Sequence, residues 1–397
     1  MTMEVPAYDI HRPAQETARG ERDGSSAGRD LARPALDAEM YELMWRDVEA
    51  GESPALLATQ TAEGIPELRE RSTKFLANDE DLSLGGRVEF EELSVPGYEG
   101  GPDVSVLILR PAGLSSPRPA IVLTNCGGKI LSDRRLLKGT GFVEVVADFD
   151  VSMVVVGMRV GPEHRHPAQV HDAYAGLCWT AQNTDALRID PGRIAVMGVS
   201  GGGGVAAATA LFARDHGGPE ISQLILLTPM LDDREITVSN WFQDVSWPRA
   251  SNHVGWTAML GDAKGGPLVD AYAAPSRADY LGALPPMYME TGSADTFRDE
   301  ILDFAARAGH AGVPVELHSW AGLMHGAGVP DTEVAKAMAA ARNSYFRRIF
   351  GPTGTGLVPN TRPPATAPRS STSNFDLDTT SSDRTVVGMG GLGWQPL

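Results

Sequence analysis

The chain has 397 residues, of which 42% are hydrophobic, and its formal net charge is −17. This length and apolar content allow one large α/β domain or two ordinary ones with a sizeable core. The acidic balance argues against a nucleic-acid partner, because no basic excess exists to release counterions from a phosphate backbone. We interpret the charge as a contribution to solubility.

The cysteine content and the N-terminus narrow the class further. Two cysteines, Cys126 and Cys178, are too few for a disulfide scaffold, and no Cys/His cluster has zinc spacing. Residues 1–31 are polar and charged and lack the apolar core of a signal peptide. No apolar run in the sequence approaches the length of a membrane span. We therefore expect a cytoplasmic protein with no membrane span, no metal and no cofactor.

The pattern along the chain predicts an arm, one domain and a tail. Residues 1–34 carry many charges, Gly and Ser without periodicity, which is typical of a flexible arm. The domain is assigned to residues 35–350, and apolar residues recur at helical spacing near its start, over 36–76. Residues 351–397 are rich in Pro, Ser, Thr and Gly, which predicts an extended or disordered tail. An apolar stretch at 389–394 could dock on this subunit or on another, which leaves a homodimer open.

Two strand-like runs, 88–95 and 104–109, predict an antiparallel hairpin across a Gly/Pro turn. Helical stretches then alternate with six further strand-like runs, at 120–124, 153–158, 194–199, 224–228, 287–290 and 313–318. This alternation predicts a mostly parallel sheet with helices on both faces. Residues 232–283 interrupt it, and an insertion of this length is typical of a lid or cap. A helix over 333–350 closes the domain.

The sequence Gly-Val-Ser-Gly-Gly at 198–202 follows a predicted strand and precedes a helix. Strand, sharp turn and helix form the context of a nucleophile elbow, in which Ser200 would project from the top of the sheet. The helix behind it would supply a positive dipole end and backbone N–H groups. The alternatives are a Gly-rich turn with an incidental serine, or a phosphate-binding loop, although the P-loop lysine is missing.

A serine nucleophile needs a base and an acid that orients the base, expected in the chain order Ser, acid, His. His325 follows the last predicted strand and is therefore the best base, whereas His310 and His318 lie in a polar turn and on the strand. Asp295 follows the preceding strand and is the candidate acid. Its neighbours Asp299 and Glu300 fall at a helix start, where acids serve the helix dipole, but one of them could replace it.

An oxyanion site is expected where the strand at 120–124 runs into Asn125, Cys126, Gly127 and Gly128. The backbone N–H groups of Gly127 and Gly128, with that of Gly201, could converge on a carbonyl oxygen. An ordinary Gly-Gly turn is the alternative. The His/Glu mixture at 161–167 also invites a metal interpretation, but two prolines cramp the ligands and a rigid loop is preferred.

Taken in order, these stretches resemble the hormone-sensitive-lipase-like esterases, the third subgroup of α/β-hydrolase folds. The resemblance covers about residues 36–350 and is carried by 159–164 with Pro167, 172–174, 189–191 with 193–194, the elbow, 229–234, 284–286, Asp295 with 297–300, 311–316, and His325 with Gly326. It implies an eight-stranded sheet and a helical cap built from about 36–76 and 232–283. It also implies catalytic roles for Ser200, Asp295 and His325, and oxyanion roles for Gly127, Gly128 and Gly201.

The chain departs from that family at a few positions. The usual His-Gly-Gly-Gly loop is Asn-Cys-Gly-Gly here, so Asn125 and Cys126 replace the histidine and the first glycine. Val199 and Gly201 stand where Asp and Ala are frequent, and Met158 where Tyr is usual. Asn125 and Cys126 are therefore expected to face the substrate, as are four cap residues, Met44, Trp45, Trp241 and Trp256.

The expected activity is hydrolysis of a small-molecule carboxylic ester through an acyl-enzyme on Ser200. The altered loop motivates an alternative that keeps the triad and changes the substrate to a lactone, an amide or a specialised biosynthetic intermediate, with acyl transfer included. A non-catalytic ligand-binding protein on the same scaffold is the alternative from another class. Such proteins lose a triad member, whereas all three are present here.

Overall fold

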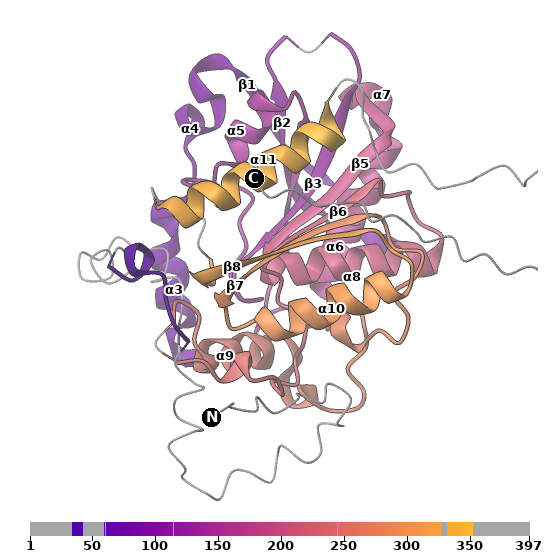
Figure 1. Ribbon diagram of the computed structural model, residues 1–397. Helices are drawn as coiled ribbons and strands as arrows, with labels where there is room; N and C mark the ends of the chain where they lie inside the picture. The colour runs from indigo at the N-terminus through magenta and orange to yellow at the C-terminus, as the bar shows by residue number, and fades with distance from the viewer. Residues whose placement is uncertain are drawn as a thin grey trace, which may run out of the picture. The chain divides into compact units, whose positions relative to one another are not determined.

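The computed structural model describes residues 34–42, 59, 61–113, 115–243, 245–326 and 332–351, all within the unit Met1–Leu357 (Figure 1). The predicted flexible arm, apart from residue 34, and the predicted tail, apart from residue 351, lie outside these ranges. Met44 and Trp45 also lie outside the described residues.

The predicted sheet is confirmed as one eight-stranded sheet in the order β1-β2-β4-β3-β5-β6-β7-β8. The predicted hairpin pairs β1 with β2, and β2 pairs with β4, both antiparallel, while all other pairs are parallel. The strands are β1 Val88–Val95, β2 Val104–Pro111, β3 Arg118–Cys126, β4 Ser152–Gly157, β5 Ile189–Ser200, β6 Gln223–Leu227, β7 Met287–Ala294 and β8 Val315–Met324.

Helices cover both faces of the sheet, as predicted (Figure 1). One face packs against α6, α8 and α10, and the other against α5 and α11. The helices are α3 Ile65–Ser72, α4 Asp79–Ser83, α5 Phe142–Asp148, α6 Ala168–Gln182, α7 Thr184–Leu187, α8 Gly201–His216, α9 Arg249–Leu260, α10 Arg298–His310 and α11 Glu333–Phe350. Short 3₁₀ turns add η3 Ala62–Gly64, η4 Thr73–Phe75, η5 Leu84–Gly86, η6 Tyr98–Gly100, η7 Ser239–Trp241, η8 Gly261–Ala263 and η9 Pro275–Arg277. In the described part of the chain, no helix is both long and apolar enough to cross a membrane.

Burial explains why the strands differ in composition. Every residue of β6 is buried, and so is every residue of β4 except Gly157, which matches their nearly continuous apolar sequences. Strands covered on both faces have no solvent side and therefore show no alternation. The edge strand β1 exposes some of its residues and carries three glutamates.

Five strands, namely β2, β3, β5, β7 and β8, are longer than the sequence pattern predicted. β5 begins at Ile189 and not at Ile194, and β7 continues through Ala294. The last strand was predicted over 313–318 but runs over Val315–Met324. Its second half pairs with β7, including Ala294 with Met324, so cross-strand pairing extends a segment that is too polar to predict as a strand. The extension brings the ends of β7 and β8 directly to Asp295 and His325.

The insertion at 232–283 contains α9 and three of the 3₁₀ turns. Val254 and Ala258 on α9 pack with Ile65 and Leu68 on α3, so the insertion and the segment before β1 share a small apolar core. Trp256, also on α9, faces the main core beneath it. The two segments predicted to form a cap are therefore in contact.

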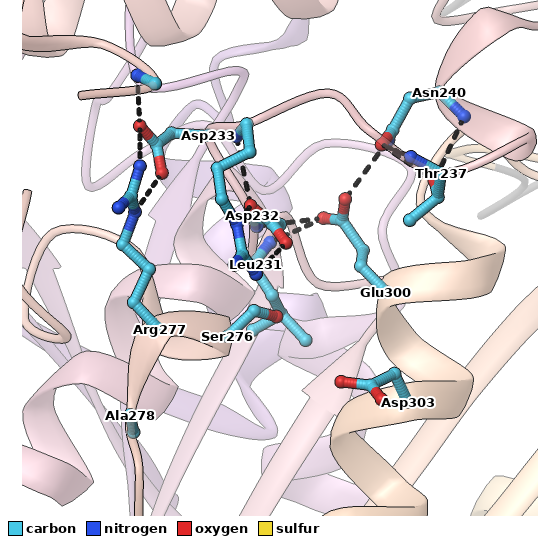
Figure 2. Close-up of polar contacts among 12 residues, drawn as sticks. Leu231, Asp232, Asp233, Thr237, Asn240, Ser276, Arg277, Ala278, Glu300 and Asp303 are labelled. Atoms are coloured by element: carbon cyan, nitrogen blue, oxygen red, sulfur yellow. Dashed lines mark hydrogen bonds and ion pairs between the residues drawn. The ribbon is translucent and has the colours of Figure 1, made fainter. Parts of the chain in front are cut away.

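Glu300 on α10 anchors the start of this insertion (Figure 2). Oε1 of the buried carboxylate accepts hydrogen bonds from the backbone N–H groups of Leu231 (2.7 Å) and Asp232 (3.3 Å), and Oε2 accepts one from Nδ2 of Asn240 (3.1 Å). Burial, followed by the nearby charge of Asp232, raises the pKa of Glu300 well above its ordinary value.

The aspartates beside Glu300 have their own cations. Asp232 pairs with Arg234 (2.6 Å) and the fully buried Asp233 with Arg277 (2.5 Å). Asp233 also accepts a hydrogen bond from the backbone N–H of Gly265 (2.6 Å), which ties two parts of the insertion together. Each of the two aspartates therefore pairs with an arginine, whereas Glu300 accepts hydrogen bonds from uncharged donors.

We expect Glu300→Gln to flatten the dependence of stability on pH. A raised pKa means that the folded protein holds this proton more tightly than the unfolded chain. The contribution of this proton to the free energy of unfolding is fully present below the ordinary pKa of 4.5. It is lost as pH rises through the pKa of Glu300 in the folded protein. Denaturant unfolding at several pH values between 4.5 and 8 measures how the free energy of unfolding changes with pH. Asp303→Asn, at an exposed acid on the same helix, is the matched control, and a Gln variant as pH-dependent as wild type would contradict the assignment.

Candidate active site

Ser200 stands at a sharp turn between β5 and α8. Its backbone has φ 56° and ψ −124°, a strained conformation for a residue with a side chain. A Cβ at Gly198 would lie 2.3 Å from the Gly202 carbonyl oxygen, so the turn requires glycine there. Thr124 on β3 braces the turn, because its hydroxyl donates to the Gly202 carbonyl (2.9 Å). The strand–turn–helix context predicted for Ser200 is present.

Ser200, His325 and Asp295 form one hydrogen-bonded chain. The Ser200 Oγ lies 2.8 Å from the His325 Nε2, and the His325 Nδ1 lies 3.1 Å from the Asp295 Oδ1. Asp295 is fully buried, and its Oδ1 also accepts a hydrogen bond from the backbone N–H of Phe297 (2.9 Å). A buried carboxylate against Nδ1 favours the tautomer that carries hydrogen on Nδ1 and leaves Nε2 free to accept the serine proton.

Neighbouring residues also hold His325 through its ring and through its backbone. The ring of Phe297 meets it edge-on, with ring centroids 4.7 Å apart and planes at 84°. The Ser246 hydroxyl, from the insertion, donates to the backbone carbonyl of His325 (2.5 Å). Trp247, the next residue, places its ring centroid 6.3 Å from that of the imidazole. The insertion therefore supports the histidine directly.

The other predicted acids and histidines lie elsewhere. Asp299 accepts a hydrogen bond from the backbone N–H of Ser239 (2.8 Å), and Glu300 holds the insertion. His318 is bonded to Glu316 (3.1 Å), and His310 is exposed at the end of α10. Asp295 is thus the acid in contact with His325.

The glycine loop after β3 differs from the expectation at one position. The Gly127 N–H donates to the Leu131 carbonyl (2.7 Å), so this group is already occupied and its predicted oxyanion role is not supported. Gly128 has φ 52°, and a Cβ there would lie 2.2 Å from the Trp247 ring. Gly201 is the first residue of α8, where the N–H groups have no partner within the helix. Gly128 and Gly201 remain as candidate donors.

Lys129, which follows these glycines, is a further residue of the site that was not predicted from the sequence. Its side chain is 1% exposed, and its Nζ donates to the Gly201 carbonyl (3.0 Å). The ammonium also lies 5.3 Å from the ring centroid of Trp256. A positive charge is therefore held at the start of α8, beside the serine turn. Nothing in the local sequence signals this, because a lysine in a Gly-rich turn is ordinarily exposed.

A cavity of about 230 Å³ opens beside Ser200 and His325. Its lining includes Asn125, Gly127 and Gly128, together with the apolar side chains of Phe75, Leu131, Leu136, Phe142, Val199, Leu227, Trp247, Leu323 and Met338. This volume is below the roughly 300–1,000 Å³ of pockets for drug-sized ligands. The cavity therefore suits a small substrate group.

Only some of the predicted substrate-binding residues line the cavity. Asn125 lines the cavity, although its Nδ2 donates to the Leu136 carbonyl (2.5 Å) and so holds the neighbouring loop. The backbone of Cys126 pairs with Ser200 across the sheet, and its side chain is outside what the structure describes. The predicted positions of Trp241 and Trp256 on the wall are not supported. Trp241 is part-exposed against Arg249, and Trp256 is fully buried beneath the site.

The segment 161–167 is a structural loop that α3 holds in place. Arg69 binds both carboxylate oxygens of Glu163 (2.8 Å each) and the Gly161 carbonyl (2.8 Å). The Arg69 guanidinium lowers the pKa of Glu163 to about 2. Within the described ranges, no group of three or more His, Cys, Asp or Glu is placed to hold a metal ion.

Comparisons with known proteins agree with this geometry. Residues 126–328 match the family described as alpha/beta hydrolase fold. The chain is 35% identical over 214 residues to Esterase LipI of Mycobacterium tuberculosis, an alignment that covers 52% of this chain and 65% of that protein. It is 30% identical over 270 residues to Carboxylesterase NlhH of the same species, covering 67% of this chain and 82% of that one. This chain therefore spans just under two thirds of LipI.

Solved structures lead to the same group of proteins. A bacterial heroin esterase superposes with a TM-score of 0.69 at 35% identity, covering 75% of this chain and 98% of that chain. The esterase LipW from Mycobacterium marinum superposes with a TM-score of 0.66 at 27% identity, covering 81% and 99%.

We expect Gly128→Ala to destabilise the protein more than Gly139→Ala does. Both glycines have positive φ, so alanine costs about 1–2 kcal/mol of backbone strain at either position. At Gly128 the new methyl group also collides with Trp247, whereas nothing lies within 4 Å at Gly139. Overpacking of this kind costs about 1–3 kcal/mol more. Chemical denaturation measures the difference, and equal losses would show that Trp247 does not press on this loop.

Proposed function

The chain belongs to the alpha/beta hydrolase fold family, and from that premise we propose that it is a serine-dependent carboxylic ester hydrolase. The observation that carries the proposal is the Ser200–His325–Asp295 chain, with distances of 2.8 and 3.1 Å. Relatives named as esterases and carboxylesterases support the same activity. The proposed substrate is a small-molecule ester, while the cytoplasmic location and the homodimer stay predictions.

The proposed mechanism assigns one role to each member of the triad. His325 accepts the Ser200 proton at Nε2 while Ser200 Oγ attacks the ester carbonyl. His325 then protonates the leaving alcohol, and water hydrolyses the acyl-enzyme by the reverse sequence. Asp295 holds the imidazole and stabilises its charged form without taking the proton.

The proposed oxyanion donors are the backbone N–H groups of Gly128 and Gly201. Two features of the chain support this pair. Trp247 packs against Gly128 and restricts the loop, and Ser200 is followed directly by the first turn of α8. The Lys129 ammonium beside the Gly201 carbonyl adds positive charge near the position where the oxyanion forms.

We also propose that the segments 36–76 and 232–283 form a cap over the site. Their shared apolar core between α3 and α9 supports this assignment, as does the contact of Ser246 with the backbone of His325. In the same way, residues 35–350 are proposed as a single catalytic domain. A non-catalytic ligand-binding role is disfavoured, because such a protein has no need of the aligned serine, histidine and buried aspartate.

Ser200→Ala is expected to abolish ester hydrolysis. Loss of the nucleophile lowers kcat by about 10⁴-fold or more, because the remaining groups bind the substrate without forming an acyl-enzyme. A p-nitrophenyl acetate assay and labelling with a fluorophosphonate probe measure the loss. Ser83→Ala, at a hydroxyl on α4 that donates to the Glu80 carbonyl (3.1 Å) and lies outside the cavity lining, is the control and should still be labelled. A wild-type protein that is neither labelled nor active would contradict the proposal.

The variant loop at Asn125 and Cys126 is proposed to set the substrate range. We expect Cys126→Gly, which restores a glycine of the family pattern, to change relative rates across a panel of esters and lactones more than it changes the fold. Measuring kcat/KM for wild type, Cys126→Gly and Ser200→Ala tests this. A panel in which lactones or amides outrank simple esters would favour the alternative substrate class. Identical profiles for wild type and Cys126→Gly would exclude a role for the cysteine.

A further inference from the structure

Two oppositely charged side chains lie side by side on the wall of the cavity beside Ser200. Glu290 comes from β7 and Arg342 from α11, and both belong to a lining that is otherwise largely apolar. Neither residue touches Ser200, His325 or Asp295 in any hydrogen bond of the described structure. The proposed hydrolytic mechanism does not use them.

The two side chains form an ion pair that is largely buried. Nη2 of Arg342 donates to Oε1 of Glu290, and the Tyr288 hydroxyl donates to Oε2 (3.0 Å). The side chains of Glu290 and Arg342 are only 2% and 15% exposed. Glu290 lies between Leu227 and His318 in the sheet, so it occupies a central strand position.

Fold stability does not account for this pair. Removing two charges from water is costly, and replacing such a pair with apolar residues of similar volume is often neutral or stabilising. The neighbouring position of β6 shows that an apolar residue packs well here, because Leu227, the cross-strand partner of Glu290, is buried. A buried pair on the wall of a cavity therefore points to a ligand.

Arg342 retains a donor for that ligand. Its Nη1 makes no hydrogen bond to the described residues, whereas its Nε is enclosed by protein atoms. A guanidinium N–H that has no partner in the protein is available to an acceptor on a bound ligand. The guanidinium cannot lose its proton, so it remains a donor at every relevant pH.

Resting on the proposed ester hydrolysis, we propose that Arg342, oriented by Glu290, binds an uncharged oxygen acceptor on the substrate. The substrate class is an ester whose acid or alcohol part carries a carbonyl, hydroxyl or ether oxygen a few bonds from the scissile group. Arg342 contacts this oxygen through a hydrogen bond, and the apolar walls enclose the carbon chain between it and the ester.

The charge balance selects a neutral acceptor over a carboxylate. Glu290 offsets the charge of Arg342 within the cavity wall, so a substrate carboxylate would meet Glu290 as well as Arg342. Lys138 also lines the cavity, but its side chain is 51% exposed and lies 3.9 Å from Asp81, so solvent and that carboxylate weaken its field.

Shape-matched substrate pairs test the proposal. On the acid side, p-nitrophenyl 4-oxopentanoate is compared with p-nitrophenyl 4-methylpentanoate. On the alcohol side, 3-oxobutyl acetate is compared with 3-methylbutyl acetate. Each pair exchanges only a carbonyl oxygen for a methyl group. We expect wild type to prefer the oxo member of at least one pair by about tenfold or more in kcat/KM, the effect of one hydrogen bond to a charged donor.

Variants then assign the preference to Arg342. Arg342→Met keeps the length of the side chain and removes the donor, so the oxo preference should disappear or reverse. Arg347→Met makes the same change at an exposed position of α11 and should keep the wild-type preference. Glu290→Gln removes the offsetting charge, and turnover of p-nitrophenyl hydrogen succinate should rise relative to the oxo ester.

The outcomes separate this proposal from the proposed function. Absence of Ser200-dependent hydrolysis of p-nitrophenyl acetate would contradict the function itself. Normal hydrolysis of that ester with no oxo preference in either pair would overturn only the role of Arg342, and this wild-type measurement stands even where a variant fails to fold. A wild type that prefers the succinate ester over both oxo esters would also overturn it.

Discussion

The parallel pairing of β5, β6, β7 and β8 is the constraint on which the site depends. Parallel strands present their carboxyl ends at the same edge of the sheet, so residues that follow these strands meet in space. Ser200 and His325 are 125 positions apart in the chain, and Asp295 and His325 are 30 apart. The parallel pairing of these strands therefore brings together residues that are far apart in the chain.

Several buried polar groups lie around this edge of the sheet, and each makes a different contact. Asp295 is fully buried and orients His325, while Glu300 holds the insertion that supports the same histidine through Ser246. Lys129 places its charge on the Gly201 carbonyl. Each group would cost free energy in an apolar core without its partners, so their concentration at one edge fits a site that is organised in advance of substrate binding.

The sequence predicted those features that rest on local patterns and on strand ends. Ser200 was identified because glycines and a strand–helix transition surround it, and His325 and Asp295 because each follows a strand. The eight-stranded sheet and the closing helix followed from alternation and from the resemblance. Strand limits were less accurate, because pairing with β7 rather than composition extends β8 to Met324.

The remaining details depend on contacts between distant segments and carry no local signal. Trp247 rather than Trp256 reaches the cavity, although both are tryptophans of the same insertion. The Gly127 N–H is occupied by Leu131, a contact that the Gly-Gly pattern does not reveal. Glu290 gave a weak signal, as an acid inside an apolar strand, but its partner Arg342 could be found only from the packing of α11.

The altered glycine loop acts through its connections as well as through its own atoms. The Asn125 side chain holds the Leu136 carbonyl, and the segment that follows contributes Lys138, Gly139 and Thr140 to the cavity wall. Asn125 therefore lies at the strand end beside Ser200, and its side chain also holds the segment that forms the part of the cavity wall at residues 138–140. We expect a substitution at this position to change the shape of the cavity without touching the reacting atoms. Departures from the family pattern here are therefore proposed to bear on substrate range before they bear on chemistry.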